Sequence, residues 1–76
     1  MKPTFEEFYE AVEQGFKKRW QVLEAEEAER YLASELDFIK IRYGEISKEY
    51  DDGLIDRKTF MIGGVASVAH CLEMMY

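Results

Sequence analysis

The chain contains almost none of the residues that interrupt helices. Its single proline is Pro3, and its five glycines leave long stretches without a breaker. Because glycine and proline are the strongest local breakers of regular structure, most of the chain is free to form long helices. With 76 residues, 47% of them hydrophobic and 34% charged, the composition is that of one compact domain. We therefore expect a single all-α domain over residues 1–76.

The first helix is predicted from its start signal and its apolar period. Thr4 followed by Glu7 forms a capping box, which marks a helix N-terminus. Apolar residues then recur every three or four positions, as on one face of a helix: Phe5, Phe8, Tyr9, Val12, Phe16, Trp20 and Leu23. The opposite face runs from acidic to basic, the order that complements the helix dipole: Glu6, Glu7, Glu10 and Glu13, then Lys17, Lys18 and Arg19.

A second helix is predicted from about residue 24 to 50, because the acid-to-base order restarts at Glu24 and closes at Lys48. We expect a break over residues 21–24, although no glycine or proline stands there. The alternative is one continuous helix of about 47 residues, roughly 70 Å long at 1.5 Å per residue. The apolar stripe expected to face the core comprises Ala25, Ala28, Leu32, Leu36, Ile39, Tyr43, Ile46 and Tyr50.

The clearest turn lies at residues 50–56. Gly53 can adopt the left-handed conformation that ends a helix, and Asp56 can cap the next helix. Leu54 and Ile55 are expected to plug the core. A third helix then runs from about 57 to the C-terminus, with an apolar stretch that is shorter than the roughly 20 residues needed to span a bilayer. The prediction is a small three-helix bundle of long helices, joined by a tight Asp-Asp-Gly turn.

The segment 52–60 resembles the second half of an EF-hand loop, with Gly53 at the sixth loop position. The calcium-ligand positions implied by that resemblance are Lys48, Tyr50, Asp52, Asp56 and Thr59. Calcium requires carboxylates at the first and third positions and a bidentate glutamate at the last. Lys48 and Thr59 do not meet this requirement, so we expect no calcium binding. A zinc site is not expected either, because the chain has one histidine and one cysteine.

The charge balance and the lack of catalytic patterns exclude several functions. A net charge of −6 disfavours contact with phosphate backbones, so we do not expect direct nucleic-acid binding. The carboxylates have no recognisable nucleophile or phosphate-binding loop near them, so we expect neither an enzyme nor a cofactor. The single Cys71 and the lack of a leader-like N-terminus favour a reducing cytoplasm and no secretion. Because the apolar stretch of the third helix is short, we expect no membrane partner.

A protein partner, or a second copy of the chain, is the expected ligand. Tyr31, Phe38 and Ile41 lie off the predicted core stripe, and such apolar patches on helices recognise proteins. The chain is accordingly predicted to be a non-enzymatic acidic interaction module, such as a regulator or inhibitor of the kind that mobile elements encode. Acids including Glu24 and Glu27 suggest an alternative, a nucleic-acid mimic that blocks a nucleic-acid-binding protein. A structural homodimer subunit is the remaining alternative.

Overall fold

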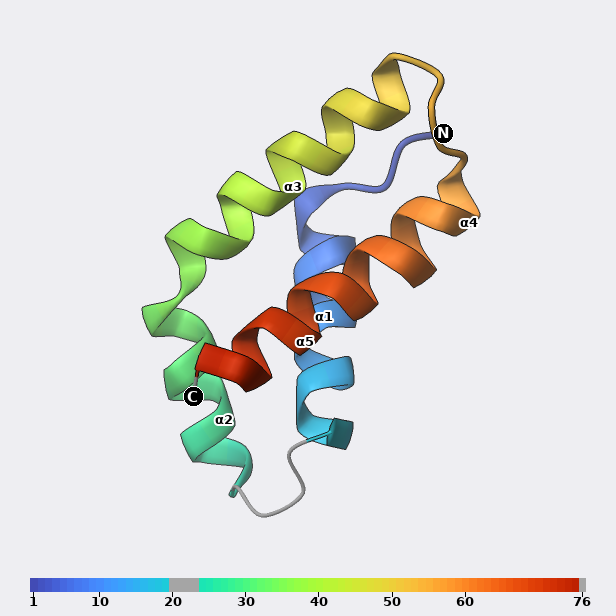
Figure 1. Ribbon diagram of the computed structural model, residues 1–76. Coiled ribbons are helices and arrows are strands. Elements are labelled where there is room, and N and C mark those ends of the chain that lie inside the picture. Colours follow the sequence, from blue (N-terminus) through green and yellow to red (C-terminus); the bar gives the residue numbers. More distant parts are fainter. Residues whose placement is uncertain (20–23, 76) are drawn as a thin grey trace.

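All regular structure in the described residues, 1–19 and 24–75 of the computed structural model, is helical (Figure 1). The elements are α1 (Phe5–Arg19), α2 (Ala25–Ser34), α3 (Leu36–Asp51), α4 (Arg57–Thr59), a π-helical turn (Phe60–Gly64) and α5 (Val65–Met75). The last three follow one another without interruption. Counted as one helix, they join α1, α2 and α3 to give four helices in the described part of the chain, a compact all-α globule. The prediction of three helices was wrong.

The extra helix arises because the predicted helix over 24–50 is divided at Glu35. Glu35 leaves helical geometry, with φ −102° and ψ 17°, and its N–H is shared between the carbonyls of Tyr31 and Leu32. The Ser34 hydroxyl donates to the Tyr31 carbonyl at 2.6 Å. Serine bonds of this kind compete with the helix ladder and bend helices. The bend allows Leu32 on α2 and Ile39 on α3 both to be fully buried.

The break between the first two helices was predicted over residues 21–24, and residues 20–23 lie outside the described residues. On either side of them α1 ends at Arg19 and α2 begins at Ala25. The described parts of α1 and α2 pack against each other, and the longest extent is 38 Å. A continuous helix of about 70 Å is therefore excluded.

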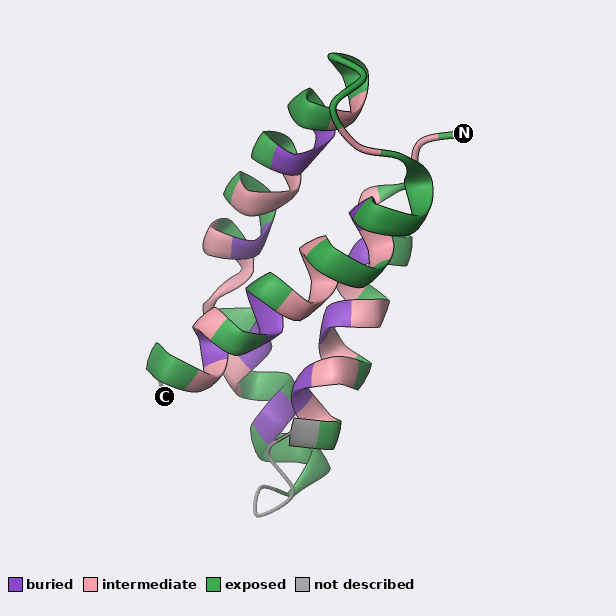
Figure 2. Ribbon diagram, turned by 45° about the vertical axis from the view of Figure 1, so that its right-hand side comes forward, coloured by how far each residue is buried: buried purple, intermediate pink, exposed green. Residues whose placement is uncertain are grey.

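The core lies where α1 and α5 cross and where α2 and α3 close over them (Figure 2). Of the positions predicted to form the apolar face of the first helix, three are confirmed as core, since Phe8, Val12 and Phe16 are fully buried. These three form one cluster with Ala28, Leu32, Ile39, Ile46, Phe60, Val68 and Leu72. Phe5 and Tyr9 are half-buried, and Trp20 and Leu23 lie outside the described residues. Two positions of the second stripe are exceptions: Ala25 is exposed at the start of α2, and Leu36 is half-buried outside this cluster.

The turn after α3 confirms two predictions and corrects a third. Gly53 has φ 77°, and the Asp56 carboxylate accepts the Thr59 N–H at 2.7 Å. Leu54 was expected in the core but is 72% exposed. Its N–H bonds the Glu49 carbonyl, as in a Schellman motif, where these two side chains normally make an apolar contact. Glutamate offers no such contact, so Leu54 remains at the surface while Ile55 packs against the core.

Gly64 lets the π-helical turn pack closely against α1 and α3. A Cβ atom placed on Gly64 would lie 3.0 Å from Ile46 Cδ1 and 3.5 Å from Phe8 Cε1. The distance to Phe8 is an ordinary van der Waals contact, but the distance to Ile46 is shorter than one, so a larger residue at position 64 would require the Ile46 side chain to move.

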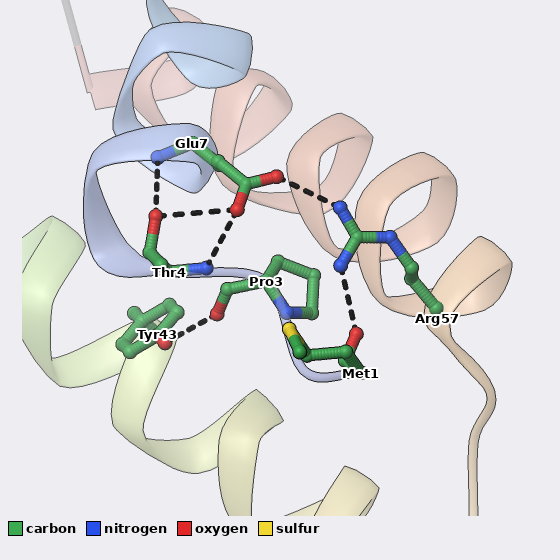
Figure 3. A network of polar contacts seen from close by, with 6 residues as sticks. All are labelled: Met1, Pro3, Thr4, Glu7, Tyr43 and Arg57. Atoms are coloured by element: carbon green, nitrogen blue, oxygen red, sulfur yellow. Dashed lines mark hydrogen bonds and ion pairs between the residues drawn. The ribbon is translucent and has the colours of Figure 1, made fainter.

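A polar junction ties the N-terminal residues to α1, α3 and α4 (Figure 3). The capping box is confirmed: Glu7 N–H donates to Thr4 Oγ1 at 3.1 Å, and Thr4 N–H donates to Glu7 Oε1 at 3.3 Å. Arg57 donates to the other oxygen of Glu7 at 2.8 Å and to the Met1 carbonyl at 2.7 Å. The Tyr43 hydroxyl donates to the Pro3 carbonyl at 2.6 Å. Three helices are thus joined at one end of the bundle.

This junction predicts a pH dependence of stability. The Thr4 N–H, followed by Arg57, lowers the pKa of Glu7 from its ordinary value of 4.5. A lowered folded-state pKa adds stability above about pH 4.5, and this contribution is lost as the pH falls through the folded-state pKa. Glu7→Gln should therefore lower the thermal midpoint at neutral pH and flatten its decline in acid, measured by circular dichroism from neutral to acidic pH. Glu10→Gln is the control, and superimposable profiles for Glu7→Gln and the natural chain would contradict this role of Glu7.

Candidate functional site: a groove between α1 and α3

A shallow apolar groove of about 300 Å³ lies between the first turns of α1 and the start of α3. Its lining consists of Phe5, Glu6, Tyr9, Glu10, Glu13 and Leu36. Five of these six residues come from one face of α1, and Leu36 is the first residue of α3. We call this feature the α1/α3 groove. Its form, an apolar floor with a few polar groups at the edge, is the form that binding sites usually take.

The floor of the groove is held in place by the core. Phe5 and Tyr9 are half-buried, with ring centroids 5.9 Å apart, and Phe5 meets the ring of Tyr43 edge-on at 5.5 Å. Leu36 reaches the groove because the chain turns at Glu35 and starts a new helix. The floor therefore depends on the break between α2 and α3.

The rim of the groove carries three carboxylates, Glu6, Glu10 and Glu13. Four- and three-residue spacing places them on one side of α1. Within residues 1–19 and 24–75, none of the three forms a hydrogen bond or ion pair, whereas Glu7 is bound by Arg57 and Glu29 by Lys17 at 3.2 Å. The rim is thus an uncompensated strip of negative charge beside apolar surface.

The pKa of Tyr9 reflects both the burial and the negative charge around the groove. Burial raises the pKa of its phenol, and the negative charges of Glu13 and Glu29 raise it further. Burial disfavours any unpaired charge beside Tyr9, and the two carboxylates disfavour a further anion there. The groove is therefore apolar on its floor and favourable to cations at its edge.

A second hollow, of about 200 Å³, lies between α3 and the last helix, but its charges are balanced. It is lined in part by Arg42, Glu49 and Ser67. Arg42 pairs with Glu45 at 3.0 Å and reaches Ser67 at 3.5 Å. Because Arg42 and Glu49 contribute opposite charges, this hollow lacks the strong preference in charge that the α1/α3 groove has.

The predicted partner-binding residues lie elsewhere. Glu24 and Glu27 are exposed at the start of α2, and Ile41 is 64% exposed on α3. Tyr31 and Phe38 are half-buried and pack against the core, so the expectation that they lie off it was wrong. The Tyr31 hydroxyl donates to the Leu72 carbonyl at 3.0 Å, and its ring lies 5.4 Å from that of Phe16. Whether these five residues contact a partner stays a prediction.

The physical reason for this correction is the break at Glu35. Residues seven apart share a face only when the helix between them is continuous. Tyr31 lies in the last turn of α2 and Phe38 in the first turn of α3, so each ring can turn inward separately. Phe38 and Ile41 lie on α3, whereas Glu24 and Glu27 lie at the start of α2.

The sequence pattern did contain a signal for the groove. Glu6, Glu10 and Glu13 follow one another at four- and three-residue spacing beside Phe5 and Tyr9, and they were assigned to the solvated side of the first helix. Their neighbour Leu36 was assigned to a core stripe. The groove follows only when a new helix begins at Leu36, which a continuous helix over 24–50 does not allow.

Comparison of the chain with models of known protein families, with curated protein sequences and with solved structures found no match. Among residues 1–19 and 24–75, no group of three or more histidine, cysteine or acidic side chains could hold a metal ion. In the same part of the chain, no helix combines the length and the apolar character needed to cross a membrane.

Proposed function

We propose that this chain is a non-enzymatic interaction module that binds a protein partner in the α1/α3 groove. The observation that carries the proposal is the combination of the apolar floor of Phe5, Tyr9 and Leu36 with the unpaired rim. Covering such a floor removes apolar surface from water at a gain of about 25 cal/mol per Å². The rim then selects the partner by charge.

The α1/α3 groove is proposed to bind a partner and not to catalyse a reaction. Its titratable lining groups are three carboxylates and one phenol, with no pair of nucleophile and base among them. A module of this size with one docking groove acts by occupying its partner, as a regulator or an inhibitor does.

The proposal can be tested by selecting ligands for the groove. A displayed library of random peptides, unbiased in charge and long enough for about four helical turns, is selected on the natural protein. Binders are then measured on Leu36→Gln and, as a matched control, on Ile41→Gln, the same change on the same helix outside the groove. We expect Leu36→Gln to weaken binding about tenfold or more and Ile41→Gln to leave it unchanged. Binders that depend on Ile41 and not on Leu36 would contradict the proposal.

The same variants separate the alternatives. A nucleic-acid mimic binds its partner through carboxylates alone, so Leu36→Gln would leave its binding intact while salt would abolish it. A structural homodimer would show twice the chain's mass of 9.0 kDa in solution before any ligand is added. The groove proposal expects a monomer that binds a peptide.

A further inference from the structure

We infer that the segment bound in the α1/α3 groove is a basic amphipathic helix, with one bulky apolar side chain on the floor and lysine or arginine side chains over the rim. This inference rests on the proposed function and adds the chemistry of the partner. It follows from three properties of the groove: the charge of the rim, the spacing of the rim and the size of the floor.

The charge of the rim selects a cationic partner. A neutral segment covering the groove would remove water from Glu6, Glu10 and Glu13 and give nothing in return, and an acidic segment would add repulsion. Among the described residues, none of these carboxylates is held in an ion pair or a hydrogen bond. Lysine and arginine side chains replace the lost water with charge-assisted hydrogen bonds. Their long apolar stems can also lie along the rings of Phe5 and Tyr9.

The spacing of the rim selects a helix over an extended strand. Steps of four and three residues separate the rim carboxylates by about 6 Å and 4.5 Å along the axis of α1. A second helix lying alongside α1 presents bases with the same two steps. An extended strand places side chains on one face every two residues, about 6.6 Å apart, and so loses register with the rim after one step.

The size of the floor limits the apolar part of the partner. A groove of about 300 Å³ lined by two aromatic rings and one leucine is at the lower end of the range for ligand sites. It therefore suits one large side chain, such as leucine, methionine or phenylalanine. The expected motif is one such residue between basic residues at helical spacing.

The test uses the peptides obtained from the charge-unbiased selection described above. Those that depend on Leu36 are sequenced, and their content of lysine and arginine is compared with that of the unselected library. Each is then measured by fluorescence anisotropy on a rim variant, in which Glu6→Gln, Glu10→Gln and Glu13→Gln are combined. The matched control combines Glu24→Gln, Glu26→Gln and Glu27→Gln, which changes the net charge equally on the exposed start of α2.

We expect the selected peptides to be enriched in bases at helical spacing, to bind the rim variant at least about tenfold more weakly, and to bind the control variant almost normally. Equal losses on both variants would overturn the inference, because they would indicate attraction by net charge alone. Leu36-dependent peptides without added bases would overturn the inference and leave the proposed function standing. The absence of any Leu36-dependent peptide would overturn both.

Discussion

Phe60→Ala is expected to remove a large part of the stability of this domain. Phe60 is fully buried, and its ring lies within 6.0 Å, centroid to centroid, of the rings of Phe8, Tyr43 and Tyr50. Truncating a buried phenylalanine to alanine costs about 3–5 kcal/mol. At roughly 0.05–0.15 kcal/mol per residue, a chain of 76 residues has about 4–11 kcal/mol in total. The variant should therefore lose between about a quarter and all of its free energy of unfolding.

The measurement is urea unfolding followed by circular dichroism. Ile62→Ala is the matched control, since Ile62 stands two residues later in the same π-helical turn and is 63% exposed. Its free energy of unfolding should remain within about 0.5 kcal/mol of the natural chain. A Phe60→Ala variant as stable as Ile62→Ala would show that the aromatic cluster is not the centre of the core.

The double variant Tyr31→Ser and Phe38→Ser is expected to lose several kcal/mol of stability, by the order of magnitude of buried aromatic truncations. Both side chains pack against the core, and removing Tyr31 also leaves the Leu72 carbonyl without its hydrogen bond. Losing one partner of such a bond costs about 1–3 kcal/mol when the other is buried. The sequence pattern alone predicted the opposite result, a change within about 1 kcal/mol.

Ile41→Ser is the control for this pair, because Ile41 belongs to the same predicted patch and is largely exposed. Its unfolding midpoint should match that of the natural chain. If the double variant were instead as stable as Ile41→Ser, Tyr31 and Phe38 would be surface residues, as the heptad argument assumed, and the contacts described for them would be wrong.

Local signals predicted the helix ends and the core of the first helix. The capping box at Thr4 and Glu7, the left-handed Gly53 and the Asp56 cap each need only a few neighbouring residues, and all three form as expected. Phe8, Val12 and Phe16 recur every four residues, as expected for the buried face of a helix, and all three are buried.

The break at Glu35 could not be predicted in the same way, because no glycine or proline marks it. It depends on the Ser34 hydroxyl bonding to the Tyr31 carbonyl and on the burial gained when α2 and α3 pack separately. Burial of that kind is decided by residues far away in the chain, including Leu72. Leu36 lines the α1/α3 groove as the first residue of α3. The sequence pattern did not predict that α3 begins there, so it missed the candidate site together with the break.

The most direct test of the docking proposal is a nuclear magnetic resonance titration of the isotopically labelled chain with a selected peptide. The account predicts that the backbone amide signals that shift most belong to residues 5–13 and to the start of α3 around Leu36. Shifts centred instead on Tyr31, Phe38 and Ile41, or on Glu24 and Glu27, would contradict it. The binding surface would then comprise the residues that the sequence pattern suggested.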